Sequence, residues 1–170
     1  MLVCGASAVA AAQNRPPIVQ ARMVLATDGV HAGSSAKAAV VAEIASGFHI
    51  NDHQPTLDYL IPTELKLDPP PRLAVAKLVY PKGELKSFAF SDTQLSVYQG
   101  TIEVGALLKV ARATPPGSYT LKGKFHYQAC NERACLPPTS VPVELTLKLV
   151  PRSVPLKPAN AEFLRQINFD

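Results

Sequence analysis

The sequence predicts an all-β fold, an antiparallel β-sandwich. About eight or nine short segments, alternating or rich in β-branched residues, follow one another at spacings of about ten residues. Proline and glycine turns separate them, and the 16 prolines are close to twice the usual share of about 5%. Because proline interrupts helices, long helices are not expected.

Two long strands are expected on either side of a pair of cysteines, Cys130 and Cys135. Residues 119–128 and 141–149 both place apolar residues or glycine at every second position. That period of two is typical of a strand with one buried and one solvent-exposed face. We therefore expect the cysteine turn at the tip of a β platform, and the two strands near each other at an edge or end of the domain.

The remaining strands are expected N-terminal to this pair. Residues 27–35 and 52–56 are expected to be loops, and the prolines at 69–71 cannot pair in a β-ladder. After Val150 the segment at 160–169 either forms one short amphipathic helix or remains loose. The expected strands are residues 18–25, 37–45, 48–51, 63–67, 73–80, 85–90, 95–98 and 101–110.

One domain is predicted between two terminal segments, because 170 residues suffice for one hydrophobic core but not for two ordinary domains. Residues 1–17 are interpreted as the remainder of a signal peptide and a linker, since the small apolar segment ends in three alanines before Gln13. This segment is too short to span a membrane, and cleavage would remove Cys4. Residues 18–150 are expected to form the sandwich, and residues 151–170 a proline-rich tail.

The charge distribution argues against a nucleic-acid partner. The formal net charge is +4 and the pI is about 9.0, but the lysines and arginines are scattered among the expected strands. Neither a basic stripe nor a base-stacking motif accompanies them. We expect no binding of nucleic acid.

Cys130 and Cys135 are the candidate functional residues, and two interpretations of them stay open. A structural disulfide would close a ring of six residues and stabilise the fold by only about 2 kcal/mol in the chain-entropy model. A redox-active pair is the other interpretation, since a short ring at an exposed strand end is accessible to another thiolate. Arg133 would favour a thiolate, whereas Glu132 would oppose it or accept a proton.

A metal site is not supported by the spacing of the possible ligands. His126 precedes Cys130 by four residues, which places them about 13 Å apart on an extended strand. One ion could not reach both of them and Cys135. A blue-copper site would also need a nearby methionine, and Met23 is the only internal one.

A hydrolase site is not supported either. The chain has no G-x-S-x-G or H-E-x-x-H motif. His49 and His53 flank Asp52, which a polar turn explains as well as an acid–base or metal pair does.

Five stretches between about residues 38 and 149 carry a family resemblance: Gly47–Asn51, Leu60–Leu65, Phe88–Ser91, Leu95–Tyr98, and Tyr127–Cys130 continued by Cys135–Pro138. Together they resemble the amino-terminal periplasmic domain of the thiol:disulfide interchange protein DsbD. The most specific stretch combines a Tyr-Gln-x-Cys strand end with a Cys-x-Pro-Pro exit. The chain has one residue fewer between its cysteines than the best-known members of that family.

The resemblance implies an immunoglobulin-like β-sandwich that carries one redox-active cysteine pair. On the family's pattern, Cys135 forms the mixed disulfide with a partner and Cys130 resolves it. The family covers its cysteines with a flexible aromatic cap loop, for which Phe88 and Phe90 are the nearest candidates. Core packing explains either phenylalanine equally well.

Three further residues are expected to shield the cysteines or to contact a partner. Phe48 and His49 fall where the family places aromatic residues that line the site, although Phe48 is equally well explained as a core residue. Tyr127 belongs to the Tyr-Gln-x-Cys strand end.

The function that the resemblance implies is a periplasmic relay of reducing equivalents, hence a thiol-disulfide oxidoreductase component. Its expected partners are thioredoxin-like: the C-terminal domain of the transporter, disulfide isomerases and cytochrome c maturation thioredoxins. Direct exchange needs no cofactor or metal. We expect an exported monomer without a membrane span, and the alternative is a non-catalytic secreted binding module with a structural disulfide.

Overall fold

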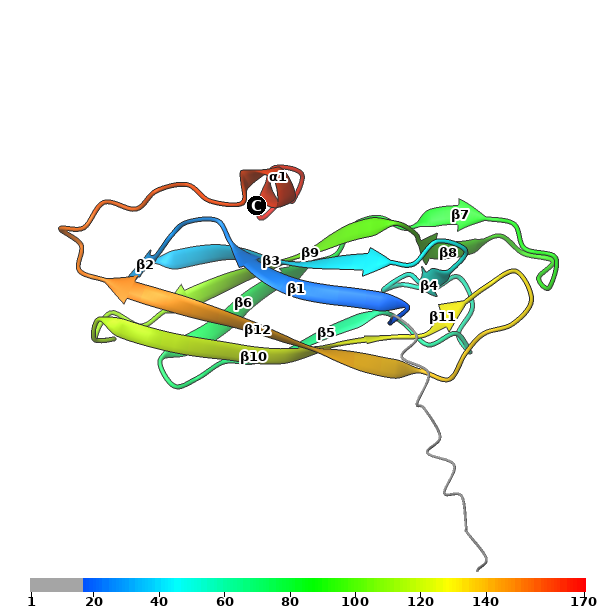
Figure 1. The fold of residues 1–170 in the computed structure, drawn as a ribbon, viewed down its shortest axis with the longest axis horizontal. Coiled ribbons are helices and arrows are strands. Elements are labelled where there is room, and N and C mark those ends of the chain that lie inside the picture. The colour runs from blue at the N-terminus through cyan, green and yellow to red at the C-terminus, as the bar shows by residue number, and fades with distance from the viewer. Residues whose placement is uncertain (1–16) are drawn as a thin grey trace, which may run out of the picture.

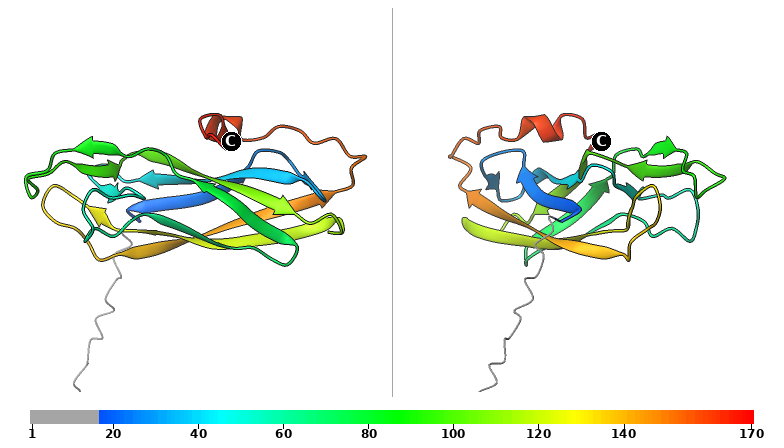
Figure 2. Two further views of the ribbon diagram at one scale, coloured as in Figure 1. Left: turned by 180° about the vertical axis from the view of Figure 1, so that it is seen from behind. Right: turned by 45° about the vertical axis from the view of Figure 1, so that its right-hand side comes forward.

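The computed structural model of the chain describes residues 17–170, which form twelve strands and one short helix. The strands make two facing four-stranded layers and a third, smaller sheet at one end (Figures 1 and 2). No helix in the described residues has both the length and the apolar character needed to cross a membrane. The predicted signal peptide and Cys4 lie outside the described residues.

The elements pair antiparallel throughout, except that β12 and β2 run parallel. The first layer has the order β1-β3-β9-β6: β1 (Val19–Leu25), β3 (Ser35–Ile44), β9 (Thr101–Val110) and β6 (Leu73–Val79). The second has the order β2-β12-β10-β5: β2 (Val30–His31), β12 (Thr139–Val150), β10 (Gly117–Tyr127) and β5 (Glu64–Asp68). The end sheet has the order β11-β4-β8-β7: β11 (Ala129–Cys130), β4 (His49–Asn51), β8 (Leu95–Tyr98) and β7 (Glu84–Lys86).

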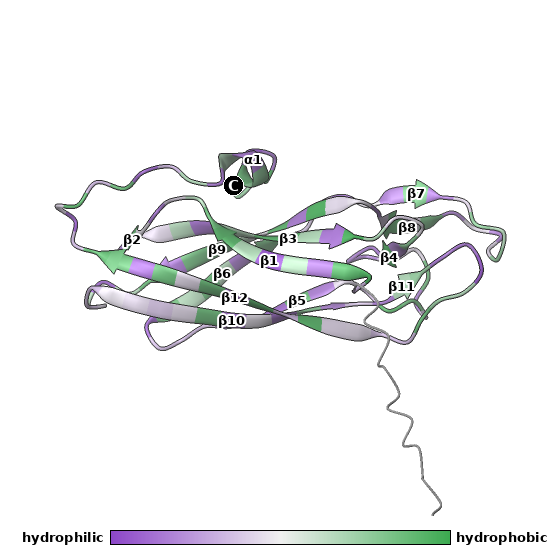
Figure 3. Cartoon of the chain, viewed as in Figure 1, coloured by the Kyte–Doolittle hydropathy of each residue, from purple (hydrophilic) through white to green (hydrophobic). Residues whose placement is uncertain are grey.

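The main core lies between the two layers, as the period-two pattern predicted. Leu121 and Phe125 of β10 and Leu147 of β12 are fully buried, and they face Val40 of β3 and Val104 of β9 in one cluster. The alternation of apolar and polar residues is visible along β12 (Figure 3). The all-β, immunoglobulin-like antiparallel sandwich is therefore confirmed.

Two details of the strand prediction are wrong. The strands around the cysteines do pair with each other, but they occupy the middle of their layer because β2 and β5 flank them. The strand expected at 85–90 ends at Lys86, because Phe88 and Phe90 enter a turn in which Ser91 donates a hydrogen bond to the Phe88 carbonyl. The short strands β2 and β11 were not expected, since two residues carry no periodic signal.

The C-terminal tail packs on the outer face of the first layer. Helix α1 (Ala161–Leu164) buries Leu164, and Phe169 is buried in the same cluster as Val41. Gly105 of β9 makes room for this contact, since a Cβ there would lie 3.1 Å from the Phe169 ring. Strand β3 is thus covered on both faces, which explains its continuous apolar run at residues 38–42.

We predict that Phe169→Ala lowers the free energy of unfolding by about 3 kcal/mol, because it empties a buried aromatic site between the tail and β9. Urea unfolding followed by circular dichroism measures the change. Val154→Ala is the matched control, since Val154 lies in the same tail but is 42% exposed, and it should shift stability by less than about 0.5 kcal/mol. Equal effects of the two substitutions would contradict docking of the tail.

Candidate functional site

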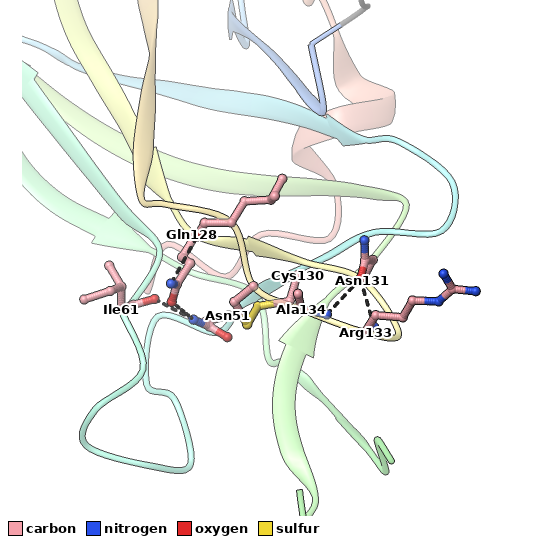
Figure 4. Close-up of a disulfide and its surroundings, with 9 residues drawn as sticks. Asn51, Ile61, Gln128, Cys130, Asn131, Arg133 and Ala134 are labelled. Carbon is pink, nitrogen blue, oxygen red and sulfur yellow. Dashed lines mark hydrogen bonds between the residues drawn. A yellow bond between two sulfur atoms is a disulfide. The ribbon is translucent and has the colours of Figure 1, made fainter. Parts of the chain in front are cut away.

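Cys130 and Cys135 form a disulfide at the end of the sandwich where the third sheet lies (Figure 4). The sulfurs are 2.01 Å apart, and the two residues also form an isolated antiparallel bridge with their Cα atoms 3.9 Å apart. Cys130 belongs to β11 and is only 1% exposed, whereas Cys135 is exposed to solvent. The two members of the pair thus differ in exposure, with Cys130 buried and Cys135 at the surface.

The loop between the cysteines is held by Asn131. Its side-chain Oδ1 accepts hydrogen bonds from the backbone amides of Arg133 and Ala134, at 2.8 and 3.0 Å. The backbone amide of Asn131 donates to the Ala134 carbonyl. Just after the ring, the backbone amide of Leu136 donates to the Ala129 carbonyl. The loop thus has a defined hydrogen-bonded shape besides its disulfide. Asparagine in a tight turn was the available sequence signal for this role.

The charged side chains of the loop contribute less than the sequence suggested. Arg133 is exposed, and its guanidinium group points away from the disulfide (Figure 4). Its predicted role in favouring a thiolate therefore has no support from this geometry. Glu132 is also exposed, and it acts electrostatically on the buried His49.

A polar network anchors the disulfide end to the neighbouring loops. The Asn51 amide donates to the Gln128 Oε1 and to the Ile61 carbonyl, at 3.2 and 2.9 Å (Figure 4). Gln128 in turn donates to the Leu136 carbonyl at 3.2 Å, and the Thr63 hydroxyl donates to the Asn51 carbonyl at 2.6 Å. This network was not predicted from the sequence, because its members are distant along the chain and meet only in the folded structure.

His49 lies directly beside Cys130. The two residues are Cα partners in the antiparallel ladder of β4 and β11, so their side chains share one face of the sheet at a Cβ separation of about 5 Å. His49 is 3% exposed and its Nε2 has no hydrogen-bond partner. Burial lowers the pKa of this imidazole below its ordinary 6.5, and the charge of Glu132 opposes the shift in part. His49 is consequently neutral at neutral pH.

A stack of rings extends from His49 toward solvent. The ring of Phe88 stacks on His49 with centroids 4.2 Å apart, and Phe90 stacks on Phe88 at 5.3 Å. Phe88 also packs against a small apolar cluster that includes Leu95 and Val97, while Phe90 is 44% exposed. The two predicted cap residues therefore lie together over the histidine that neighbours Cys130.

Phe48 and Tyr127 do not belong to this stack. Phe48 packs against the main core, and so does Ile50, the next residue but one. Tyr127 is 4% exposed and tilts against Phe125 in the same core, with ring centroids 6.1 Å apart. Their role in shielding the cysteines or contacting a partner stays a prediction, and both side chains pack in or against the main core.

The structure does not bring together the possible metal ligands His126, Cys130 and Cys135, nor the group of His49, Asp52 and His53. The His126 ring bonds the Ser140 hydroxyl at 3.0 Å on the long strands, and no three His, Cys, Asp or Glu side chains cluster as a metal site would require within residues 17–170. Asp52 accepts hydrogen bonds from the hydroxyls of Ser96 and Tyr98. His53 stacks on Tyr80 at 3.6 Å, and it therefore has different neighbours from His49.

Comparison with known families gives a match over most of the chain. A family model described as "Thiol:disulfide interchange protein DsbD, N-terminal" matches residues 17–147. No curated protein sequence matches the chain.

Two solved structures of N-terminal domains are similar to this chain. The N-terminal periplasmic domain of ScsB from Proteus mirabilis has a TM-score of 0.52 at 15% identity; the match covers 75% of this chain and 45% of that one. This chain therefore spans less than half of the ScsB domain. The reduced N-terminal domain of Neisseria meningitidis DsbD has a TM-score of 0.43 at 20% identity. The match covers 81% of this chain and 90% of that one.

We predict that His49 makes stability depend on pH. The folded state binds the imidazole proton more weakly than the unfolded state does. The contribution of His49 to the free energy of unfolding therefore has its full value above pH 6.5. It falls as the pH decreases from 6.5 toward the lower pKa of the folded state, and the loss is constant below that pKa. Urea unfolding between about pH 4 and 8 measures this contribution as the difference between the wild type and His49→Phe.

His49→Phe keeps an aromatic ring on Phe88 but cannot titrate, so its stability should lack this component. Parallel stability curves for the two proteins across this range would contradict the assigned direction of the His49 pKa.

Proposed function

Because the chain belongs to the family of the N-terminal domain of the thiol:disulfide interchange protein DsbD, we propose that it relays reducing equivalents through its Cys130–Cys135 disulfide. The observation that carries the proposal is the asymmetry of the pair. Cys135 is exposed at the tip of the molecule, and Cys130 is buried behind it. Such a pair has one sulfur for the partner and one for resolution.

The exchange follows from this asymmetry. A thiolate of a reducing partner attacks Cys135 Sγ, the bond to Cys130 breaks, and its electron pair goes to Cys130 Sγ, which takes up a proton. A second thiolate of the partner then attacks the partner's first sulfur in the mixed disulfide. Cys135 leaves as a thiolate and takes up a proton. The domain is left with two thiols, and the partner with a disulfide. The reverse sequence passes two electrons to an acceptor disulfide.

The aromatic stack protects the reduced pair between encounters. Phe88 is anchored on its own apolar cluster and covers His49, whereas the exposed Phe90 is free to move with the turn. Between encounters the stack covers His49 beside the buried Cys130, and docking of a partner displaces it. The protein thus supplies access and shielding, and the sulfurs supply the chemistry.

We assign thioredoxin-like proteins of the periplasm as partners, since these carry the dithiols that this exchange requires. Residues 18–150 form the exchange domain, preceded by an export signal at residues 1–17 and followed by the docked tail. The domain acts as a monomer and uses no bound cofactor. The alternative function is a non-catalytic binding module with a structural disulfide, and the experiments below distinguish it from the relay.

We predict that the disulfide has a reduction potential between about −180 and −270 mV, the range of exchange proteins. Equilibration of the purified protein in glutathione buffers, with thiols counted after acid quenching and alkylation, measures it. A potential below about −300 mV would mark a structural bond and end the relay hypothesis.

Cysteine variants separate the same two outcomes by another measurement. The Cys130→Ser, Cys135→Ser double variant should stay folded, since the loop keeps its Asn131 hydrogen bonds and the short ring contributes only about 2 kcal/mol. It should lose all electron transfer from a reduced thioredoxin used as probe. A double variant that unfolds at ordinary temperature would instead favour the structural disulfide.

We predict that Phe88→Ala accelerates reduction of the disulfide by dithiothreitol about tenfold, which corresponds to about 1.4 kcal/mol of lost shielding. The substitution removes the ring that covers His49 beside Cys130. The rate is read from thiol appearance under excess reductant. Leu85→Ala is the matched control, because Leu85 lies on the preceding strand β7, is 61% exposed and belongs to no stack. An equal rate for Phe88→Ala and the wild type would exclude the cap.

A further inference from the structure

His49 occupies a position that a purely apolar shield would not need. Its imidazole is 3% exposed, yet Nε2 has no hydrogen-bond partner in the described part of the chain. Leaving a buried polar atom unpaired costs about 1–3 kcal/mol, and a phenylalanine would stack on Phe88 without that cost. A buried, unpaired nitrogen next to a reactive group is a candidate for proton transfer.

Cys130 is the cross-strand neighbour of this histidine. The register of β4 on β11 makes the two residues direct cross-strand neighbours on one face, and Phe88 closes the other side of the imidazole. Cys130 is also the buried member of the pair. When the disulfide opens, its sulfur needs a proton that bulk water cannot readily deliver, and when the disulfide closes it must lose that proton.

We propose that His49 is the general base and acid for Cys130, a role that rests on the proposed exchange function. During closure, neutral His49 takes the proton of the Cys130 thiol, and the thiolate attacks Cys135 Sγ in the mixed disulfide. The Cys130–Cys135 bond forms, the bond from Cys135 to the acceptor sulfur breaks, and the electron pair leaves on that sulfur. After closure the imidazolium releases its proton to solvent, and during opening His49 takes up a proton again and passes it to the Cys130 thiolate. Pairing with histidine is an established way to activate a cysteine.

The charged surroundings suit this role. The charge of Glu132, from the cysteine loop, raises the His49 pKa in part and so favours the imidazolium that forms during transfer. Phe88 from the cap loop and Cys130 from β11 are the other neighbours identified, and of these only the Cys130 thiol titrates. No other charged group in residues 17–170 shifts the His49 pKa, which burial keeps below 6.5. The imidazole is therefore unprotonated and ready to accept a proton at neutral pH.

The closing step can be isolated with an aromatic disulfide, dithiobis(nitrobenzoate), as the acceptor. The reduced protein is mixed with an excess of it in a stopped-flow instrument. The first thionitrobenzoate is released as Cys135 forms the mixed disulfide, at a rate proportional to reagent concentration. The second is released as Cys130 closes the ring, at a rate independent of it. The Cys130→Ser variant should release only the first, which identifies the sulfur attacked.

For the wild type we expect a closing rate that is nearly constant between about pH 6.5 and 8, since His49 is neutral throughout. His49→Phe preserves the stack, and His49→Gln preserves a polar group; both should close about 100-fold more slowly at pH 7. Their rates should rise about tenfold per pH unit, because only the spontaneous thiolate then reacts. The first release should be unchanged in both.

His53→Phe is the matched control. His53 is also stacked on an aromatic ring, that of Tyr80 at 3.6 Å, but it lies outside the stack beside the cysteines. Its closing rate should follow the wild-type pH profile. Circular dichroism of the oxidised proteins verifies that each variant is folded.

Closing rates of both His49 variants that match the wild type in magnitude and pH profile would overturn the assignment. So would a wild-type closing rate that rises tenfold per pH unit from pH 6 to 8, a result that needs no variant. A wild type that forms the mixed disulfide and never closes the ring would remove the exchange function itself, and the role of His49 with it.

Discussion

The pairing of β11 with β4 is the contact on which the site depends. It consists of two residue pairs only, Ala129 with Ile50 and Cys130 with His49. Because the side chains of a strand alternate between faces, this register places Cys130 beside His49 and sends Ile50 into the main core. A shift by one residue would reverse both. The rigid sandwich behind it thereby fixes which sulfur is buried and which is exposed.

Stability and function are carried by different parts of the molecule. The fold rests on the core between the two layers, with Phe125, Leu121 and Leu147 fully buried, and on the tail docked outside it. The disulfide closes a short ring whose loop is already shaped by Asn131. The bond can therefore open and close without a large cost to the fold, which is the condition that a reversible redox pair must meet.

The end sheet carries the asymmetry that exchange requires. The sheet and the turn after β7 bring together a buried sulfur, a neutral imidazole and two stacked phenylalanine rings, while Cys135 remains in solvent. The polar network of Asn51 and Gln128 holds the neighbouring loops in place without occupying Nε2 of His49. Shielding and reactivity are thus arranged around the same few residues.

The sequence by itself determined the β-sandwich, since strands β10 and β12 show the period-two pattern of a half-buried strand over their length. It also singled out the cysteine pair, and through the family resemblance Phe88 and Phe90, which stack on His49. The two-residue strand β11 and the neighbourhood of His49 were decided only by tertiary structure. The physical reason is that periodicity reports which face of a strand is buried, whereas the partner across that strand is set by register between segments that are distant along the chain.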